Sequence, residues 1–248
     1  MRVGIYVDGY NLYYGGRKAL GRGIPGLGAP GWRWLDIRAL ADSLVAEHRE
    51  MWPAAAVHRI VYCTARINAG ANPSGAADQD VYLKALLSSG SVDHIEYGNY
   101  IAKVIKRPLA TEGRRGKPVI ISPAPPVAVR NNGVSIDTAT FIASVGTWEE
   151  KGSDVNVATL LMFDILTDVV DAAVVISNDS DLRLPVQETR RRVPVGVVNP
   201  GSGYTAGGLS ADANVGVGNH WWRTLAASDY TGHQLADPAG KYRKPRGW

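Results

Sequence analysis

The sequence has little cysteine and lacks long apolar runs. Its 248 residues include one cysteine, Cys63, which can form neither an internal disulfide nor a cysteine-based metal site; its setting in "IVYCTA" indicates a small buried side chain. No stretch approaches the roughly 20 consecutive apolar residues of a membrane helix, and the "VGIYV" after Met1 and Arg2 is too short for a signal peptide. We therefore expect a cytoplasmic protein without a membrane partner.

The sequence also lacks an internal repeat and a Rossmann dinucleotide-binding fingerprint. The segment "GLGAPG" has the glycines of a phosphate-binding loop, but it lacks both the flanking strand-to-helix context and the Walker lysine. Its many Gly and Pro residues predict instead that residues 21–31 form a loop near the carboxyl end of the first strand.

Positive charge is present in modest excess. The net charge is +4, the sequence pI is about 9.2, and 45% of the residues are hydrophobic, which is ample for a packed core. The basic residues cluster around 17–22, 103–107, 114–117, 190–192 and 241–246. Such clusters are typical either of a surface that binds polyanions or of ordinary solvated surface.

Strand-like and helix-like segments alternate along the chain. Apolar, mostly β-branched runs predict strands at residues 3–7, 57–64, 92–97, 172–176 and 193–198. Helical spacing or length predicts helices at residues 36–50, 78–88, 154–168 and 181–191. This alternation predicts an α/β fold with a mainly parallel sheet that helices cover on both faces.

Two parts of the chain depart from this alternation. Residues 99–150 are basic and Pro-rich, and we interpret them as an insertion in the form of a β-hairpin or arm. The residues "HWWRTLAASDY" (220–230) favour a last helix. We expect one domain at residues 1–228, interrupted by the insertion, and a basic C-terminal tail at 229–248.

Four aspartates lie where the predicted structure changes type. Asp8 ends the first strand, Asp154 opens a helix, and Asp179 and Asp181 follow the fourth strand. In a parallel α/β sheet, helix N-termini lie at the same edge as the carboxyl ends of the strands, which is also the edge that binds ligands. The pattern therefore predicts that the four carboxylates share one edge.

Carboxylates gathered at one edge repel one another, and a divalent cation removes that cost. Because this set offers oxygen ligands without Cys or His, it favours Mg²⁺ or Mn²⁺ over zinc. Asp164 does not belong to the set, because it lies about 15 Å along the helix from Asp154.

Structural roles are open for some of these residues. Asp154 can simply favour the positive end of its helix dipole, and Asp181 can cap the helix that follows it. Asn11 is either a turn former or a hydrogen-bond partner of Asp8 and a phosphate. Asp8 and Asp179 are harder to explain structurally, since Asp is disfavoured at the end of a buried strand.

The segments "YVDGYNLYYG", "EEKGSDVNVATLLMFD" and "AAVVISNDSDLRLPV" resemble the NYN domain, a bacterial branch of the PIN-like metal-dependent ribonucleases. The likeness continues in "VYCTARI", "HIEYGNY", "VPVGVVNP" and "KPRGW", so it covers most of the chain. The insertion departs from the family, because it has no Cys or His with which to form a zinc ribbon.

The resemblance implies a PIN-like, Rossmann-like fold and a metal-dependent phosphodiesterase that acts on RNA. It matches the family's acidic-site and flanking positions to Asp8, Asn11, Lys151, Asp154, Ser177, Asn178, Asp179 and Asp181. We expect the four aspartates to hold the cation as catalytic residues, and the other four positions to bind substrate. Tyr10, Tyr13 and Tyr14 either stack on unpaired bases or pack beneath the Gly-rich loop.

Two rival functions follow from the same residues. The first is a catalytically silent module that binds RNA or another protein and keeps the acidic site as architecture; the cost of retaining four like charges argues against it. The second is a phosphomonoesterase of the haloacid dehalogenase kind. That class needs a second Asp two residues after its nucleophile, whereas Asp8 is followed by Gly9 and Tyr10.

Overall fold

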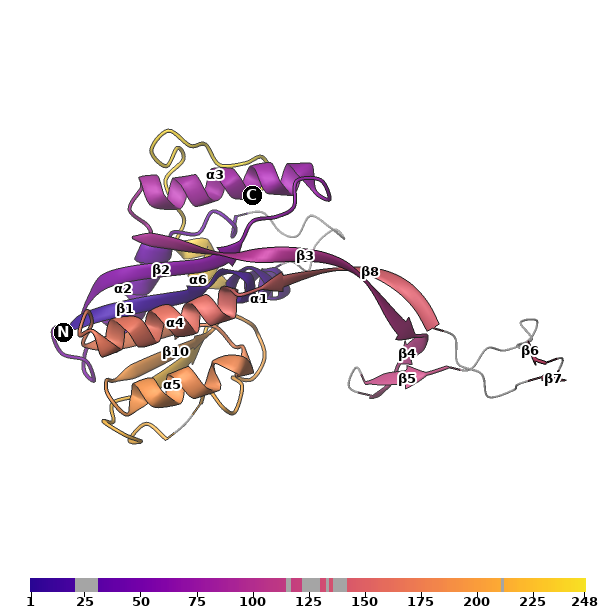
Figure 1. The fold of residues 1–248 in the computed structure, drawn as a ribbon. Coiled ribbons are helices and arrows are strands. Elements are labelled where there is room, and N and C mark those ends of the chain that lie inside the picture. Colours follow the sequence, from indigo (N-terminus) through magenta and orange to yellow (C-terminus); the bar gives the residue numbers. More distant parts are fainter. Residues whose placement is uncertain (21–30, 115–116, 122–129, 133, 136–141, 211) are drawn as a thin grey trace. The chain divides into compact units, whose positions relative to one another are not determined.

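The computed structural model describes residues 1–20, 31–114, 117–121, 130–132, 134–135, 142–210 and 212–248 (Figure 1). These residues divide into unit 1, which comprises residues 1–100 and 150–248, and unit 2, which comprises residues 101–149. Most of the predicted loop at 21–31 lies outside the described residues. Within them, no helix combines the length and apolar character needed to cross a membrane.

Unit 1 contains a mainly parallel sheet, as the sequence predicted. The order of its strands, over the described part of the chain, is β11-β10-β9-β1-β2-β3-β8. Parallel pairing joins β1 to β2 and β9, β2 to β3, and β10 to β9 and β11. The strands are β1 (Arg2–Asp8), β2 (Ala56–Ala65), β3 (His94–Pro108), β8 (Ile142–Lys151), β9 (Ala172–Ile176), β10 (Val195–Asn199) and β11 (Trp221–Thr224).

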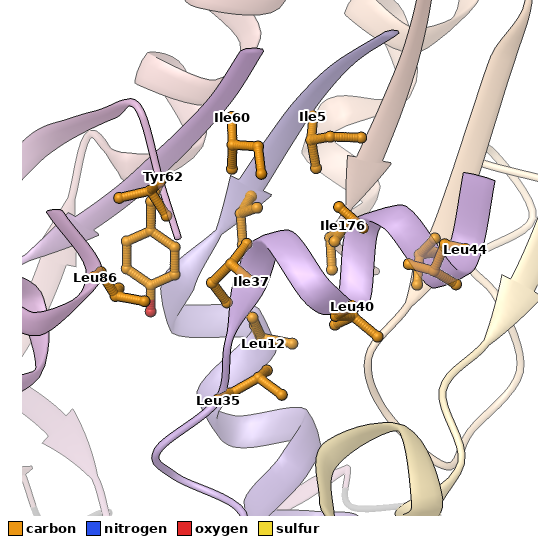
Figure 2. Close-up of a cluster of buried hydrophobic side chains, with 14 of the residues drawn as sticks. Ile5, Leu12, Leu35, Ile37, Leu40, Leu44, Ile60, Tyr62, Leu86 and Ile176 are labelled. Carbon is orange, nitrogen blue, oxygen red and sulfur yellow. The ribbon is translucent and has the colours of Figure 1, made fainter. Parts of the chain in front are cut away.

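Helices cover both faces of this sheet (Figure 1). They are α1 (Gly9–Leu20), α2 (Ile37–Glu47), α3 (Pro73–Ser88), α4 (Ser153–Leu166), the 3-10 turn η2 (Ser180–Leu182), α5 (Arg183–Arg190) and α6 (Ala227–Gly232). The side chains of β1 alternate between two separate apolar cores. Val3, Ile5 and Val7 pack with α1, α2 and α3, whereas Tyr6 packs with α4 and α5. Figure 2 shows the first core, in which Ile5, Ile60 and Ile176 of three strands face Leu40 of α2 and Leu12 of α1.

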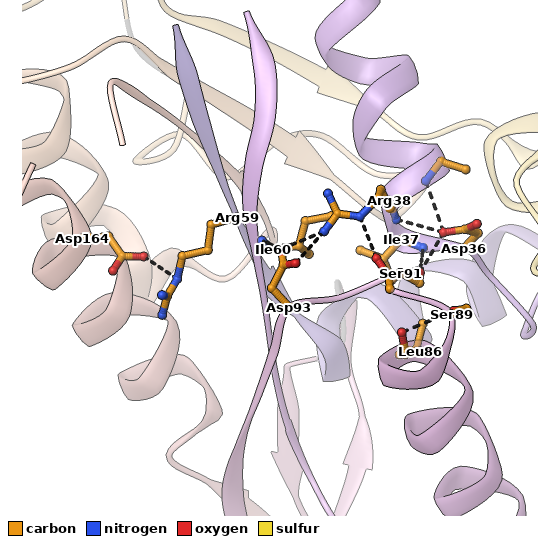
Figure 3. A network of polar contacts seen from close by, with 12 residues as sticks. Asp36, Ile37, Arg38, Arg59, Ile60, Leu86, Ser89, Ser91, Asp93 and Asp164 are labelled. Carbon is orange, nitrogen blue, oxygen red and sulfur yellow. Dashed lines mark hydrogen bonds and ion pairs between the residues drawn. The ribbon is translucent and has the colours of Figure 1, made fainter. Parts of the chain in front are cut away.

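Asp164 has a structural role on the α4 face. Its carboxylate is 1% exposed and accepts a hydrogen bond of 2.9 Å from the Tyr6 hydroxyl. It also pairs with Arg59 Nε at 3.0 Å (Figure 3). Burial and the neighbouring carboxylate raise the pKa of Tyr6 above its usual value. These bonds tie α4 to β1 and β2, in agreement with the exclusion of Asp164 from the predicted metal ligands.

A second polar network fixes the start of α2 (Figure 3). Asp36 caps this helix by accepting hydrogen bonds from the main chain of Arg38 and Ala39, and Ser91 Oγ donates to Asp36 Oδ1 at 2.8 Å. Arg38 in turn forms an ion pair with Asp93 at 2.7 Å. The network joins α2 to the segment that leads into β3.

The prediction of one helix at residues 220–230 is wrong. Residues Trp221–Thr224 form β11, and a helix begins only at Ala227. Trp221 lies opposite Gly196 in the parallel pairing with β10, and its indole stacks on His48 at 3.8 Å between ring centroids. Pairing with β10 and burial of the large ring therefore override the helical pattern.

The sequence analysis also missed α1, which begins directly after β1. Its Leu12, Gly15 and Gly16 are buried. A Cβ atom on Gly15 would collide with the carbonyl of Pro200, and one on Gly16 would lie 2.8 Å from the rings of Trp32 and Tyr230. The two glycines therefore let α1 pack closely against its neighbours, at the expense of helix propensity.

Unit 2 consists of short strands together with the second half of β3 and most of β8. Strands β3 and β8 continue into it, β4 (Ala110–Glu112) pairs antiparallel with β5 (Pro118–Ile120), and β6 (Arg130–Asn131) pairs antiparallel with β7 (Val134–Ser135). Its boundaries, 101–149, fall close to those of the expected insertion.

The last twenty residues belong to unit 1. Tyr230, Leu235 and Ala239 are buried, and the Trp248 ring lies 5.6 Å from that of Tyr82 between centroids. The segment 229–248, which we expected to be a separate basic tail, therefore packs against the core of unit 1.

The packing of α1 predicts the sign of a stability change. Replacing Gly by Ala inside an unhindered helix stabilises it, but Gly15→Ala should lower the free energy of unfolding by about 1–3 kcal/mol, because the methyl group must displace the Pro200 backbone. Gly203→Ala, where no atom lies within 4 Å of the new Cβ, is the control and should change stability little. Thermal unfolding measures both, and a higher melting temperature for Gly15→Ala would contradict the packing.

Candidate functional site

The candidate site lies where the order of the strands reverses. From β1 the chain adds β2 and β3 on one side of the sheet, and later adds β9, β10 and β11 on the other. Val7 of β1 is paired with Ile176 of β9, so Asp8 and Ser177 follow side by side at the carboxyl ends of these strands. Ligands of open α/β sheets bind at such a switch point.

Asp8 is the buried centre of this edge. Its side chain is 4% exposed, Oδ1 accepts a hydrogen bond of 2.9 Å from the Asn11 main chain, and Oδ2 accepts one of 2.9 Å from the Ser177 hydroxyl. Ser177 Oγ also accepts a bond of 3.1 Å from the main chain of Asp179. One hydroxyl thus connects the two predicted ligands Asp8 and Asp179.

The loop after β9 is held by side-chain amides. Asn11 Oδ1 accepts from the main chain of Asn178 at 3.1 Å. Asn178 Oδ1 accepts from the main chain of Ala206 at 2.7 Å, and its Nδ2 donates to the Tyr204 carbonyl at 3.1 Å. In the described structure, Asn11 and Asn178 therefore position this loop.

Asp8 and Asp179 also have the structural explanation that the sequence analysis did not find for them. The Asp8 carboxylate accepts from the third residue after it, as an N-terminal cap of α1 does, and Asp179 caps η2 by accepting from the main chain of Asp181 at 3.0 Å. From the sequence, both aspartates looked out of place at the end of a buried strand. The apolar pattern does not reveal that α1 and η2 begin directly after them.

The other two aspartates lie in the first turns of their helices. Asp154 is half-buried in α4, whose N-cap is Gly152, and Asp181 is exposed in η2. The Asp8 carboxylate accepts hydrogen bonds from Asn11 and Ser177, and the charges of Asp179 and Glu150 raise its pKa. Lys151 is exposed at the end of β8. In the residues that the structure describes, no group of three or more His, Cys, Asp or Glu is arranged to hold a metal ion.

Glu150 is a member of this edge that the sequence analysis missed. It lies half-buried in β8, and its Oε1 accepts a hydrogen bond of 3.1 Å from the main chain of Ser153 at the start of α4. Its charge acts on Asp8 as well as on Tyr10 and Tyr100. The available signal was an acidic residue directly before the predicted Asp154 helix.

The pKa of Asp8 is raised to about 6, chiefly by burial and also by the charges of Asp179 and Glu150, although the hydrogen bonds from Asn11 and Ser177 lower it. Burial and the Asp8 charge likewise raise the pKa of the Cys63 thiol to about 12, in keeping with a buried structural cysteine. The surroundings of this carboxylate therefore disfavour its ionised form.

One residue of the predicted basic clusters is buried and so is not available to a ligand at the surface. Arg190 of the 190–192 cluster is 1% exposed and donates to the Leu209 carbonyl at 2.6 Å. Burial lowers its pKa. Arg191 and Arg192 are exposed, so the cluster is smaller than the sequence suggested.

Comparison with known proteins gives one informative relative. No family model matches the chain. It is 30% identical over 241 residues to a 6-hydroxy-3-succinoylpyridine 3-monooxygenase of Pseudomonas putida; the match covers 90% of this chain and 66% of that protein, so this chain spans just under two thirds of its relative's length. A crystal structure of a protein of unknown function from Vibrio parahaemolyticus aligns over 90% of this chain and 91% of that one, at 14% identity and a TM-score of 0.38.

The buried carboxylate predicts a pH-dependent stability difference. Because the folded-state pKa of Asp8 is raised to about 6, folding favours its protonated form, so the parent should lose stability as pH rises from about 4 through 6. Asp8→Asn should match the parent at pH 4 and be more stable by about 2–3 kcal/mol at pH 7.5 with EDTA. Chemical denaturation at both pH values measures this.

Asp212→Asn serves as the control for that measurement. Asp212 is exposed and accepts one main-chain hydrogen bond, from Asn214 at 2.9 Å, which the amide retains. The stability of Asp212→Asn relative to the parent should not increase between pH 4 and pH 7.5. A stability difference between Asp8→Asn and the parent that does not change with pH would contradict the site's electrostatics.

Proposed function

We propose that this protein is a metal-dependent ribonuclease with a PIN-like fold, which hydrolyses RNA phosphodiester bonds at the edge formed by Asp8 and Asp179. The observation that carries the proposal is the linkage of the buried Asp8 carboxylate through the Ser177 hydroxyl to Asp179, at the switch point of a parallel sheet. The same segments resemble the NYN domain, and this resemblance is the reason for proposing metal-dependent hydrolysis of RNA at this edge.

The donor atoms of this edge are of the type that Mg²⁺ and Mn²⁺ bind, although in the described residues no three of them are arranged as a metal site. Asp8, Asp179 and Glu150 supply carboxylate oxygens, which these cations prefer. We propose that Asp8 and Asp179 hold the ion and that Asp154 and Asp181 complete the set, as the resemblance implies. When bound, the ion would lower the pKa of a water molecule and offset the charge that develops on the phosphoryl oxygens.

The protein's own residues would orient the reaction. Ser177 fixes the carboxylate of Asp8, and Asn11 fixes the loop that carries Asp179. Lys151 and the amide of Asn178 are proposed to bind the scissile phosphate. Hydrolysis would join the water oxygen to phosphorus and break the bond to the 3′ oxygen, which leaves a 5′-phosphate and a 3′-hydroxyl.

Unit 2 supplies positive charge that suits an RNA backbone. Lys106, Arg107 and Lys117 are exposed there, whereas Lys103 is paired with Glu149 at 2.8 Å. Neutralising phosphates with such side chains supports sequence-independent affinity. We propose that the substrate is RNA, single-stranded or with unpaired bases.

The Pseudomonas putida relative favours a second candidate function. Its name describes a monooxygenase that acts on a substituted pyridine, and this chain would then hydroxylate an aromatic acid. The match spans just under two thirds of that protein, so its activity stands here as a candidate to be tested beside the ribonuclease. The silent binding module remains the third candidate.

Cleavage of a labelled single-stranded RNA tests the proposal. The parent with Mg²⁺ or Mn²⁺ should cut it, and EDTA should stop cleavage. Asp8→Asn and Asp179→Asn preserve side-chain size but remove a charge, so each should lower the rate by orders of magnitude, whereas Asp212→Asn should retain activity. Cleavage of a DNA of the same sequence, measured in parallel, shows whether the enzyme prefers ribose to deoxyribose in its substrate.

Two outcomes would overturn the ribonuclease. Cleavage that survives both substitutions would show that a contaminant or another site acts. Absence of cleavage, together with consumption of reduced nicotinamide and hydroxylation of a pyridine acid, would establish the second candidate. RNA binding without either reaction would establish the silent module.

A further inference from the structure

Helix α1 presents a row of aromatic side chains to solvent, next to the acidic edge. Its buried face is formed by Leu12, Gly15 and Gly16. On the opposite face Tyr10 is 42% and Tyr14 44% exposed. Arg17, one further turn along the same face, is also exposed. The spacing of these three residues, i, i+4 and i+7, aligns them along one side of the helix.

The rings on this face contact one another and are anchored to the core. The Tyr10 and Tyr14 centroids are 4.5 Å apart with their planes inclined at 44°. Tyr13 meets Tyr14 edge-on at 5.3 Å and contacts the buried Trp32 at 5.3 Å. The Arg17 guanidinium lies 6.0 Å from the centre of the Tyr14 ring. The row therefore combines aromatic faces with a cation.

The tyrosines belong to the same electrostatic neighbourhood as the acidic edge. Tyr10 stands two residues after Asp8, in the first turn of α1, and the Asp8 carboxylate accepts a hydrogen bond of 2.9 Å from the Asn11 main chain in that same turn. Burial raises the pKa of Tyr100 to about 12, with added effects from Tyr10, Tyr14 and Glu150. A ligand held on this helix face would thus lie beside the carboxylates.

The helix that carries the row packs closely against its neighbours. Because Gly15 and Gly16 have no Cβ, α1 lies directly against Pro200, Trp32 and Tyr230. The Tyr230 hydroxyl donates to the Pro200 carbonyl at 2.6 Å, so two of the residues against which α1 packs are also bonded to each other. Rigid aromatic side chains on a fixed element bind with a small loss of conformational entropy.

We propose that Tyr10 and Tyr14 form a stacking platform for unpaired bases of single-stranded RNA, and that Arg17 binds a backbone phosphate of the same strand. This inference rests on the proposed ribonuclease function and names the feature of the substrate that the site selects. Aromatic faces accept any base, and the positive charge at Arg17 complements the polyanion. From Tyr10 to Arg17 the helix advances about 10 Å, enough for adjacent nucleotides to span.

Selection of unpaired RNA follows from this arrangement. Bases inside a duplex are stacked on their neighbours and expose no free face to a tyrosine. Each base stacked on an aromatic side chain contributes about 5- to 150-fold in affinity, which corresponds to about 1–3 kcal/mol. The platform therefore favours single strands and loops over duplexes, without selecting a particular sequence.

Binding in EDTA tests the platform separately from cleavage. The fluorescence anisotropy of a labelled single-stranded RNA is measured with the full chain, and compared with a duplex of the same sequence. Tyr10→Ala and Tyr14→Ala should each weaken binding of the single strand by about 5- to 150-fold and affect the duplex little. Tyr14→Phe, which retains the ring, should bind as the parent does.

Two controls separate stacking from general damage to the surface. Phe163 is an aromatic residue 60% exposed on α4, so Phe163→Ala should leave RNA binding unchanged. An RNA with abasic positions should bind the parent as weakly as intact RNA binds the tyrosine variants, and the variants should no longer distinguish the two RNAs. In cleavage, the tyrosine variants should raise KM more than they lower kcat.

The outcomes distinguish failure of the platform from failure of the ribonuclease. Unchanged single-strand binding by Tyr10→Ala and Tyr14→Ala, or equal weakening of single strand and duplex, would overturn the platform even if the parent cleaves RNA. Tyrosine-dependent binding in a parent that does not cleave would support the platform and refute the ribonuclease. Tyrosine-dependent binding of a pyridine acid, with no RNA binding, would overturn both.

Discussion

The burial of one carboxylate, that of Asp8, is the constraint on which the rest of the site depends. It is 4% exposed at the centre of the sheet edge and keeps two hydrogen bonds, from the Asn11 main chain and the Ser177 hydroxyl. The bond from Asn11 caps the first turn of α1, the helix that carries the exposed tyrosines. The Ser177 hydroxyl that donates the second bond also accepts one from the main chain of Asp179. A buried anion is costly unless a cation or hydrogen bonds compensate it. The raised pKa of Asp8 shows that the hydrogen bonds described compensate it only in part.

Much of the parallel sheet could be predicted from the sequence, because buried strands are continuous apolar runs. Residues 172–176 were predicted as a strand and form β9 with those bounds, and residues 3–7 lie inside β1. The element boundaries that failed depend on tertiary contacts. Residues Trp221–Thr224 are a strand because they pair with β10, and α1 carries two glycines whose helical state depends on close packing against Pro200 and Trp32.

The site was predictable only in part. Parallel strands bring their carboxyl ends together, so the proximity of Asp8 and the segment after β9 follows from topology. Glu150 was missed, because it reaches the edge through β8, which the sequence analysis assigned to the insertion. Arg190 was grouped with its exposed neighbours, since a run of three arginines gives no sign that the first is buried. The competing roles of Asp8 and Asp179, as helix caps and as proposed ligands, use the same oxygen atoms and do not exclude each other.

The central claim is that the edge formed by Asp8 and Asp179 binds a divalent cation in the folded protein. Thermal unfolding with increasing Mn²⁺ tests it most directly, because a ligand that binds only the native state raises the melting temperature with concentration. The account predicts that the parent gains stability with Mn²⁺, and that Asp8→Asn and Asp179→Asn, although folded, gain much less. Equal stabilisation of the parent and both variants would contradict it, and would leave these aspartates as the caps of α1 and η2.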